Sequence, residues 1–145
     1  MATQVSRDYL ERAHTLLGEA EEACKKFDWA LSILRSAESV EFSLKAIVRV
    51  VSSSHKREHD VSGDLANVVD RFPGWFQVKI PRMNVVSRTL TTLSIPAKYG
   101  DEMLGVSSKS LFERTEAEAY LAISKQVYFD CNRLFYEMIH KTTGK

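Results

Sequence analysis

A stretch from Asp28 to Asp60 constrains the fold more than any other part of the chain, and it is typical of one long amphipathic helix followed by a basic turn with two histidines. Apolar residues recur there at steps of three and four, which is the spacing of one face of an α-helix. Glu41 is the one charged residue in that stripe, and burying an unpaired carboxylate is costly, so it needs a partner. Lys45 follows four residues later, in the favourable orientation for a helical ion pair. The stripe consists of Ala30, Ile33, Leu34, Ala37, Val40, Glu41, Leu44, Ile47, Val48 and Val51.

Two more long helices are predicted on either side of this one. Apolar spacing indicates a first helix over 4–26, and Asp28 is a good N-cap for the helix over 29–53. The connection between them is so short that the two helices should be antiparallel neighbours. Gly18 falls inside the first helix, where a close helix–helix approach would explain it. Thr115 and Glu118 form a capping-box pattern at the start of a last helix over 115–141.

The middle of the chain is divided by prolines and glycines. A short helix over 63–72 is stopped by Pro73 and Gly74, and Pro81 opens another helix, followed by a loop over 94–110. Only Phe76 to Ile80 alternates with a strand-like period of two. The predicted fold class is therefore all-α: an antiparallel helical bundle of three long helices plus one or two short ones, of the four-helix up-and-down type. We expect residues 1–145 to form a single domain.

Composition excludes several classes of protein. The chain has 145 residues, 44% of them hydrophobic and 27% charged, with a net charge of +1, as is ordinary for a soluble globular domain. Such a balance predicts no strong overall attraction to nucleic acid or membranes. No apolar run is long enough for a membrane span, and no signal peptide is evident, so we expect a cytoplasmic protein. Cys24 and Cys131 fit buried small hydrophobes better than metal ligands, and no cofactor or metal is expected.

Three segments together resemble a known family. They are Glu41-Phe42-Ser43-Leu44-Lys45-Ala46, preceded by Ala37-Glu38; the turn His59-Asp60-Val61; and Ala97-Lys98-Tyr99-Gly100-Asp101. In this order and on this helix pattern they resemble the HEPN domain (higher eukaryotes and prokaryotes nucleotide-binding). The third segment looks like the family's Arg-Tyr-Pro-Asp-like stretch, with Lys98 in place of Arg and Gly100 in place of Pro.

The resemblance implies a helical bundle that dimerises and works with nucleotides or RNA. It also implies a partner, a minimal nucleotidyltransferase encoded as a separate chain. The expected function is therefore a non-catalytic, nucleotide- or RNA-associated binding module. The candidate nucleotide-binding residues are Glu38, Glu41, Lys45, His59, Asp60, Lys98, Tyr99 and Asp101.

Many members of that family are metal-independent ribonucleases, which use an Arg and a His near the start of the last long helix. This chain has three loosely spaced Arg–His pairs, but no histidine falls between Ala97 and Ser110. Cleavage of RNA without a metal needs a general base near neutral pKa, for which histidine is the natural choice. Arg133 and His140 on the last helix are the remaining catalytic candidates for the alternative function, a ribonuclease toxin of a toxin–antitoxin pair. A plain helical interaction scaffold is a further alternative.

Several features allow both a functional and a structural interpretation. His55 and His59 have the spacing of metal ligands on a helix, but the serines before them favour a turn. Trp75 and Tyr99 could each stack on a base or pack against the domain. Apolar surface on the first and last helices predicts a symmetric homodimer. The residues assigned to that surface are Tyr9, Leu16, Leu17, Tyr128, Phe135 and Ile139.

Overall fold

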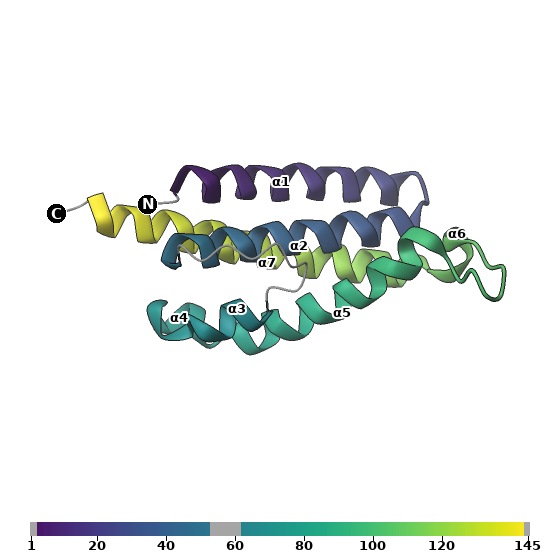
Figure 1. Cartoon of the computed structure of the whole chain (residues 1–145). Helices are drawn as coiled ribbons and strands as arrows, with labels where there is room; N and C mark the ends of the chain where they lie inside the picture. The colour runs from purple at the N-terminus through teal and green to yellow at the C-terminus, as the bar shows by residue number, and fades with distance from the viewer. Residues whose placement is uncertain (1–2, 53–61, 144–145) are drawn as a thin grey trace.

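The computed structural model describes residues 3–52 and 62–143, which fold into an all-α bundle (Figure 1). Within these residues, the nearest approach to a strand is an isolated bridge between Asp101 and Val106. The predicted fold class is confirmed. The helices are α1 (Thr3–Lys25), α2 (Trp29–Val51), α3 (Ser62–Asn67), the 3₁₀ turn η1 (Val69–Arg71), α4 (Gly74–Gln77), α5 (Ile80–Tyr99), α6 (Ser108–Leu111) and α7 (Arg114–Thr143).

The four long helices run up and down, with α2 at the centre. Figure 1 shows α1 and α5 running in one direction and α2 and α7 returning. Helix α2 packs on α1, α5 and α7, whereas α3 and α4 lead from its C-terminal end to α5. The helix that the sequence indicated as dominant is therefore the one that contacts each of the other three long helices.

Helix α2 is buried on two sides, which explains its central place. Its apolar stripe forms the core, and Ile33, Leu44 and Ile47 are completely buried. Its second buried side carries serines. Ser39 Oγ donates to the Ala13 carbonyl oxygen at 2.8 Å. Small side chains let helices approach closely, and here they lie between α1 and α2. The fully buried serines are Ser32, Ser36, Ser39 and Ser43.

The connection between α1 and α2 is a tight turn with satisfied backbone groups. Phe27 has a positive φ of 61°, and the amide of Asp28 donates to the carbonyl of Ala23 at 2.9 Å. This is the Schellman arrangement that ends many helices, here with phenylalanine in the place usually taken by glycine. The Asp28 carboxylate then accepts the amide of Leu31 at 3.2 Å. The predicted N-cap and the antiparallel neighbours are both confirmed.

The middle of the chain is more helical than the sequence predicted. Helix α5 continues to Tyr99, so residues 94–99 of the predicted loop are helical. Pro96 lies in the last turn of α5, where it costs one backbone hydrogen bond. The adjacent Ala97 is buried in the core, and this packing offsets the cost. The alternating segment from Phe76 to Ile80 is not a strand: Phe76 is completely buried in the short helix α4, a turn follows, and Ile80 begins α5. The predicted helix over 63–72 is divided into α3 and η1.

Two local predictions are wrong. Helix α7 begins at Arg114, so Thr115 is already inside it and the predicted capping box does not form. The carboxylate of Glu116 instead accepts the amide of Glu113 at 3.0 Å, two residues earlier than predicted. Gly18 marks no close approach between helices, because a Cβ atom built there meets nothing within 4 Å.

Candidate functional site

A groove of about 470 Å³ lies between α2 and α5. Its residues come from one side of each helix, four residues or fewer apart, as expected for two antiparallel helices that face each other. Carboxylates lie on the α2 side, and an ammonium group and a phenol lie on the α5 side. The groove is lined by Leu34, Ala37, Glu38, Glu41 and Phe42 of α2 and by Thr91, Ser94, Ile95, Lys98 and Tyr99 of α5.

Both carboxylates on the α2 side have a basic partner on the same helix. Arg35 lies 2.6 Å from Glu38, and Lys45 Nζ lies 3.2 Å from Glu41 Oε2. Glu41 and Lys45 are each 22% exposed, so this pair sits at the margin of the core. The partner that Glu41 needed is therefore the residue predicted from the sequence. These ion pairs fix the carboxylates in position and reduce the negative charge in the groove.

The α5 side of the groove ends in an exposed aromatic ring. Tyr99 is 58% exposed, and Lys98 Nζ lies 5.4 Å from the centre of its ring. Gly100 follows with a φ of 72°, and a Cβ atom there would lie 2.3 Å from the carbonyl oxygen of Val106. Only glycine fits this close approach, so the turn after Tyr99 is tightly built. The ring is therefore held at the end of a helix with more than half of its side chain exposed.

The structure brings four of the eight predicted nucleotide-binding residues together in the groove. These four are Glu38, Glu41, Lys98 and Tyr99. Lys45 lies beside them through its pair with Glu41. Asp101 does not line the groove; its carboxylate accepts the amide of Leu104 at 3.1 Å and stabilises the turn. The remaining two, His59 and Asp60, lie outside the described residues, as does His55.

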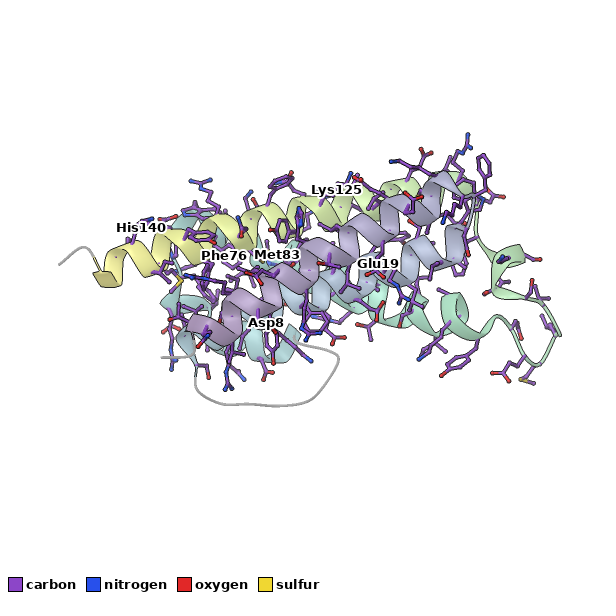
Figure 2. All side chains as sticks on the ribbon, turned by 90° about the horizontal axis from the view of Figure 1, so that it is seen from above. Asp8, Glu19, Phe76, Met83, Lys125 and His140 are labelled. Atoms are coloured by element: carbon purple, nitrogen blue, oxygen red, sulfur yellow. The ribbon has the colours of Figure 1, made fainter. Side chains whose placement is uncertain are left out.

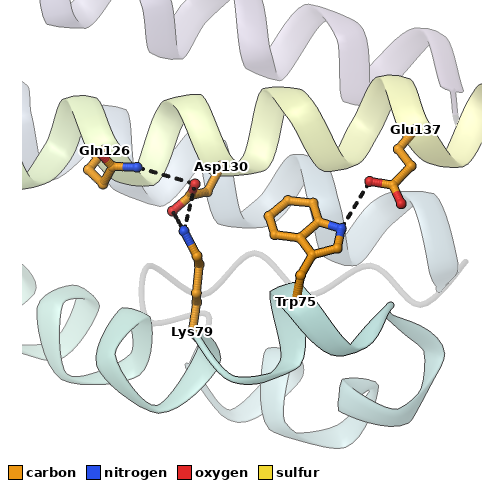
Figure 3. Close-up of polar contacts among 5 residues, drawn as sticks. All are labelled: Trp75, Lys79, Gln126, Asp130 and Glu137. Atoms are coloured by element: carbon orange, nitrogen blue, oxygen red, sulfur yellow. Dashed lines mark hydrogen bonds and ion pairs between the residues drawn. The ribbon is translucent and has the colours of Figure 1, made fainter.

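A second polar cluster joins α4 and α5 to α7 (Figure 3). Lys79 Nζ lies 3.1 Å from both carboxylate oxygens of Asp130, and Gln126 donates to the same carboxylate at 3.2 Å. Trp75 Nε1 donates to Glu137 at 2.9 Å. The indole of Trp75 therefore packs against the domain, as in the structural interpretation of this residue, and not as a free ring for stacking on a base.

The sequence analysis did not identify this cluster. Lys79 and Asp130 are far apart in the chain, and no local pattern predicts their contact. One signal was present, because Asp130 follows Val127 by three residues and precedes Leu134 by four, which places it on the buried face of the helix. A charged residue on an apolar stripe had already indicated a partner for Glu41. The same reasoning applied to Asp130 would have predicted a basic partner from another helix.

The alternative catalytic residues, Arg133 and His140, both lie on α7, seven residues apart. That spacing corresponds to about 10 Å along the helix axis. The guanidinium of Arg133 lies over the Trp75 ring, 4.0 Å from its centre. His140 is exposed near the C-terminal end of α7, far along the molecule from Lys125 (Figure 2). The two candidates do not converge on one point within this chain.

The acidic, histidine and cysteine side chains of the described residues form no metal site. No group of three such side chains within residues 3–52 and 62–143 could hold a metal ion. Cys131 is completely buried, as predicted, and burial raises the pKa of its thiol well above the usual range. Cys24 is half-buried, and its sulfur lies 3.0 Å from the hydroxyl oxygen of Ser32. The prediction of a buried thiol is thus correct for Cys131 only.

A comparison with known protein families finds a match over nearly the whole chain. A family model described as HEPN domain matches residues 6–134, from the first turn of α1 to the second half of α7. The chain belongs to the HEPN domain family. The resemblance seen in the three sequence segments is therefore confirmed. Two of those segments lie on α2 and at the end of α5, the helices that form the groove.

A solved structure shares the fold of this chain. The crystal structure of TT1696 from Thermus thermophilus is similar to this chain with a TM-score of 0.71 and 20% sequence identity. The similarity covers 88% of this chain and 96% of TT1696. A comparison with curated proteins finds no match. Among the described helices of this HEPN domain, none is long and apolar enough to cross a membrane.

Proposed function

We propose that this HEPN domain is a non-catalytic binding module for nucleotides or RNA that works beside a separately encoded minimal nucleotidyltransferase. The observation that carries the proposal is the groove between α2 and α5, where an exposed tyrosine and a lysine face two carboxylates. Four of its residues are those that the family resemblance assigned to nucleotide binding.

Each group in the groove has a role in this proposal. A base stacks on the exposed ring of Tyr99, because a tyrosine ring accepts any base on its face. Lys98 contacts a phosphate, and its exposed position at the end of α5 lets it do so without burying its charge. Glu38 and Glu41 accept hydrogen bonds from ribose hydroxyl or base amino groups. The near balance of charge in the groove suits a ligand held by stacking and hydrogen bonds more than by charge alone.

Isothermal titration calorimetry with ATP, GTP and a short single-stranded RNA tests this proposal. We expect saturable binding of at least one of them and a weakening of about tenfold for Tyr99→Ala, because base stacking contributes about 1–3 kcal/mol. Leu104→Ala is the matched control, since Leu104 is 77% exposed beyond the end of α5 and does not line the groove. Absence of binding for all three ligands, or equal binding by the two variants, contradicts the proposal.

The non-catalytic part of the proposal rests on the lack of an Arg–His pair where the family resemblance places it, since no histidine falls between Ala97 and Ser110. The remaining candidates are Arg133 and His140. They lie about 10 Å apart along one helix, and Arg133 packs on Trp75. Purified protein incubated with RNA in the presence of EDTA should leave the RNA intact. Cleavage that persists through purification and disappears in Arg133→Ala or His140→Ala would support the ribonuclease alternative instead.

The proposed partner has its own test. A gene for a minimal nucleotidyltransferase should lie beside the gene for this protein, and the two chains should copurify when expressed together. If they do not copurify while the groove still binds a nucleotide, the binding module stands and the partnership is wrong. If neither holds, the plain interaction scaffold is the better description.

A further inference from the structure

We propose that a second cavity, between the start of α5 and the middle of α7, binds a small amphipathic anion with an apolar body and a carboxylate or phosphate head. The cavity has a volume of about 350 Å³. It shares no residue with the groove between α2 and α5. The site is therefore independent of the proposed nucleotide-binding function.

The walls of the cavity are apolar on both sides. Helix α5 contributes Met83 and Val86, α7 contributes Ile123 and Val127, and Val78 lies at the edge. Met83 and Val127 belong to the core, whereas Val86 and Ile123 are half-buried and Val78 is 78% exposed. A ligand that covers these side chains removes apolar surface from water, which favours binding. The body of the ligand is therefore expected to be hydrocarbon.

The polar end of the cavity selects the charge of the ligand. Asp130, Lys79, Gln126 and Arg82 line it. The carboxylate of Asp130 is already bonded to Lys79 through both oxygens and to Gln126, so it has little remaining attraction for a cation. Arg82 is exposed and has no acidic partner among the described side chains. Its positive charge is the one left without an opposite charge at the cavity.

The two basic groups can act on the same head group. An arginine presents a planar fork of donors that matches a carboxylate or a phosphate. Lys79 has three ammonium protons, and the two contacts to Asp130 leave one for a ligand. The pair with Asp130 also holds Lys79 in place before a ligand arrives, which reduces the entropy lost on binding. The cavity thus combines an apolar slot with a preorganised positive end.

Equilibrium dialysis with radiolabelled octanoate tests the proposal directly. We expect saturable binding of one octanoate per chain, about tenfold weaker for Arg82→Ala because a charge-assisted hydrogen bond is lost. Arg88→Ala is the matched control, an exposed arginine on the same helix that does not line the cavity, and it should bind like the unchanged protein. Val86→Phe, which fills the slot, should abolish binding while circular dichroism stays unchanged.

The charge of the head group provides the second arm of the test. Unlabelled octanoate and octyl phosphate should displace the radiolabel, whereas octylamine should not. The proposal is overturned if octanoate does not bind saturably, if Arg82→Ala binds as tightly as Arg88→Ala, or if octylamine competes equally well. Tyr99→Ala should leave octanoate binding unchanged, so failure of this site and failure of the nucleotide groove can be told apart.

Discussion

Lys79 Nζ lies 3.1 Å from both carboxylate oxygens of Asp130, and this contact joins the start of α5 to the middle of α7. The two partners differ in burial, because the side chain of Lys79 is 40% exposed and that of Asp130 only 11% exposed. A lysine that loses its partner can turn to water. An aspartate that loses its partner stays under the apolar side chains around it.

The two halves of this pair should therefore have unequal effects on stability. Lys79→Met leaves a buried carboxylate with Gln126 alone and should lower the free energy of unfolding by about 1–3 kcal/mol. Asp130→Asn should cost less, since the amide still accepts a hydrogen bond and Lys79 can reach solvent. Urea denaturation of both variants measures the difference. Equal losses of stability in the two single variants would show that the pair is no more than a surface contact. The Lys79→Met/Asp130→Leu double variant, which has no buried charge, should recover part of the stability that Lys79→Met loses.

Two glycines in the turn after α5, compared with a third inside α1, allow a graded test of backbone strain. Gly100→Ala should be the most destabilising, by more than about 1 kcal/mol, because its Cβ would lie 2.3 Å from the carbonyl oxygen of Val106 at positive φ. Gly105→Ala should be milder, since φ is 67° but the space around it is open. Gly18→Ala should stabilise the protein by about 0.5–1 kcal/mol, because it removes a glycine from a helix interior. Thermal unfolding that ranks the three variants differently would contradict this account.

The start of α7 offers a direct comparison between the predicted and the observed cap. Glu116→Ala removes the carboxylate that accepts the amide of Glu113 and should destabilise the protein by about 0.5–1 kcal/mol. Glu118→Ala, the matched control from the predicted capping box, should change stability by no more than a few tenths of a kcal/mol. Chemical denaturation decides between them. A larger loss for Glu118→Ala would restore the original placement of the cap.

The sequence predicted the long helices well because their apolar spacing is continuous and their ends carry local signals. Asp28 caps α2, and Glu41 pairs with Lys45, as the sequence indicated. Both interactions join residues within one helical turn of each other, so the sequence itself contains the geometry. The groove residues of α2 and α5 were found through the family resemblance, because no local rule brings Glu38 next to Tyr99.

Other features depend on contacts between distant segments, which local patterns do not contain. Helix α5 continues past Pro96 because Ala97, at the end of the helix, is buried in the core. The proline alone favours a loop at this position. The serines of α2 are fully buried because α1 covers them, although serine alone suggests a surface position. Lys79 and Asp130 meet only once α5 and α7 are packed. These misses all arise where tertiary packing overrides a local preference.

The thiol of Cys131 should make stability depend on pH above neutrality. Burial is the main cause that raises the pKa of this thiol, with the charge of Asp130 second. In the unfolded chain the pKa of a cysteine thiol is about 8.5. As the pH rises through that value, the unfolded state loses a proton that the folded state keeps, so the free energy of unfolding falls by up to about 1.4 kcal/mol per pH unit.

Urea denaturation between about pH 8 and about pH 9.5 measures this slope, and the tyrosines, which begin to ionise at the top of that range, are present in both proteins that are compared. Cys131→Ala should be less stable at every pH but should show a flatter dependence. Cys24 is present in both proteins, so its contribution cancels in the comparison. Identical slopes would mean that the Cys131 thiol ionises in the folded state as readily as in the unfolded chain.

The predicted homodimer depends on which apolar residues of α7 remain at the surface. Leu17 and Phe135, two of the residues assigned to the interface from the sequence, are buried in the core and cannot form it in this fold. Phe129 is 63% and Tyr136 is 43% exposed, and they lie two turns apart on the same side of α7. Exposed aromatic residues grouped in this way are typical of protein interfaces.

We predict a symmetric dimer in which these two rings lie near the two-fold axis. Phe129→Glu places one carboxylate from each subunit close to its symmetry mate, and the repulsion and desolvation should give a monomer. Val85→Glu is the matched control, because Val85 is 61% exposed and lies on a different helix, α5. Light scattering coupled to size-exclusion chromatography distinguishes the two masses. If the unchanged protein is a monomer at micromolar concentrations, or if Phe129→Glu and Val85→Glu behave alike, the dimer does not form through α7.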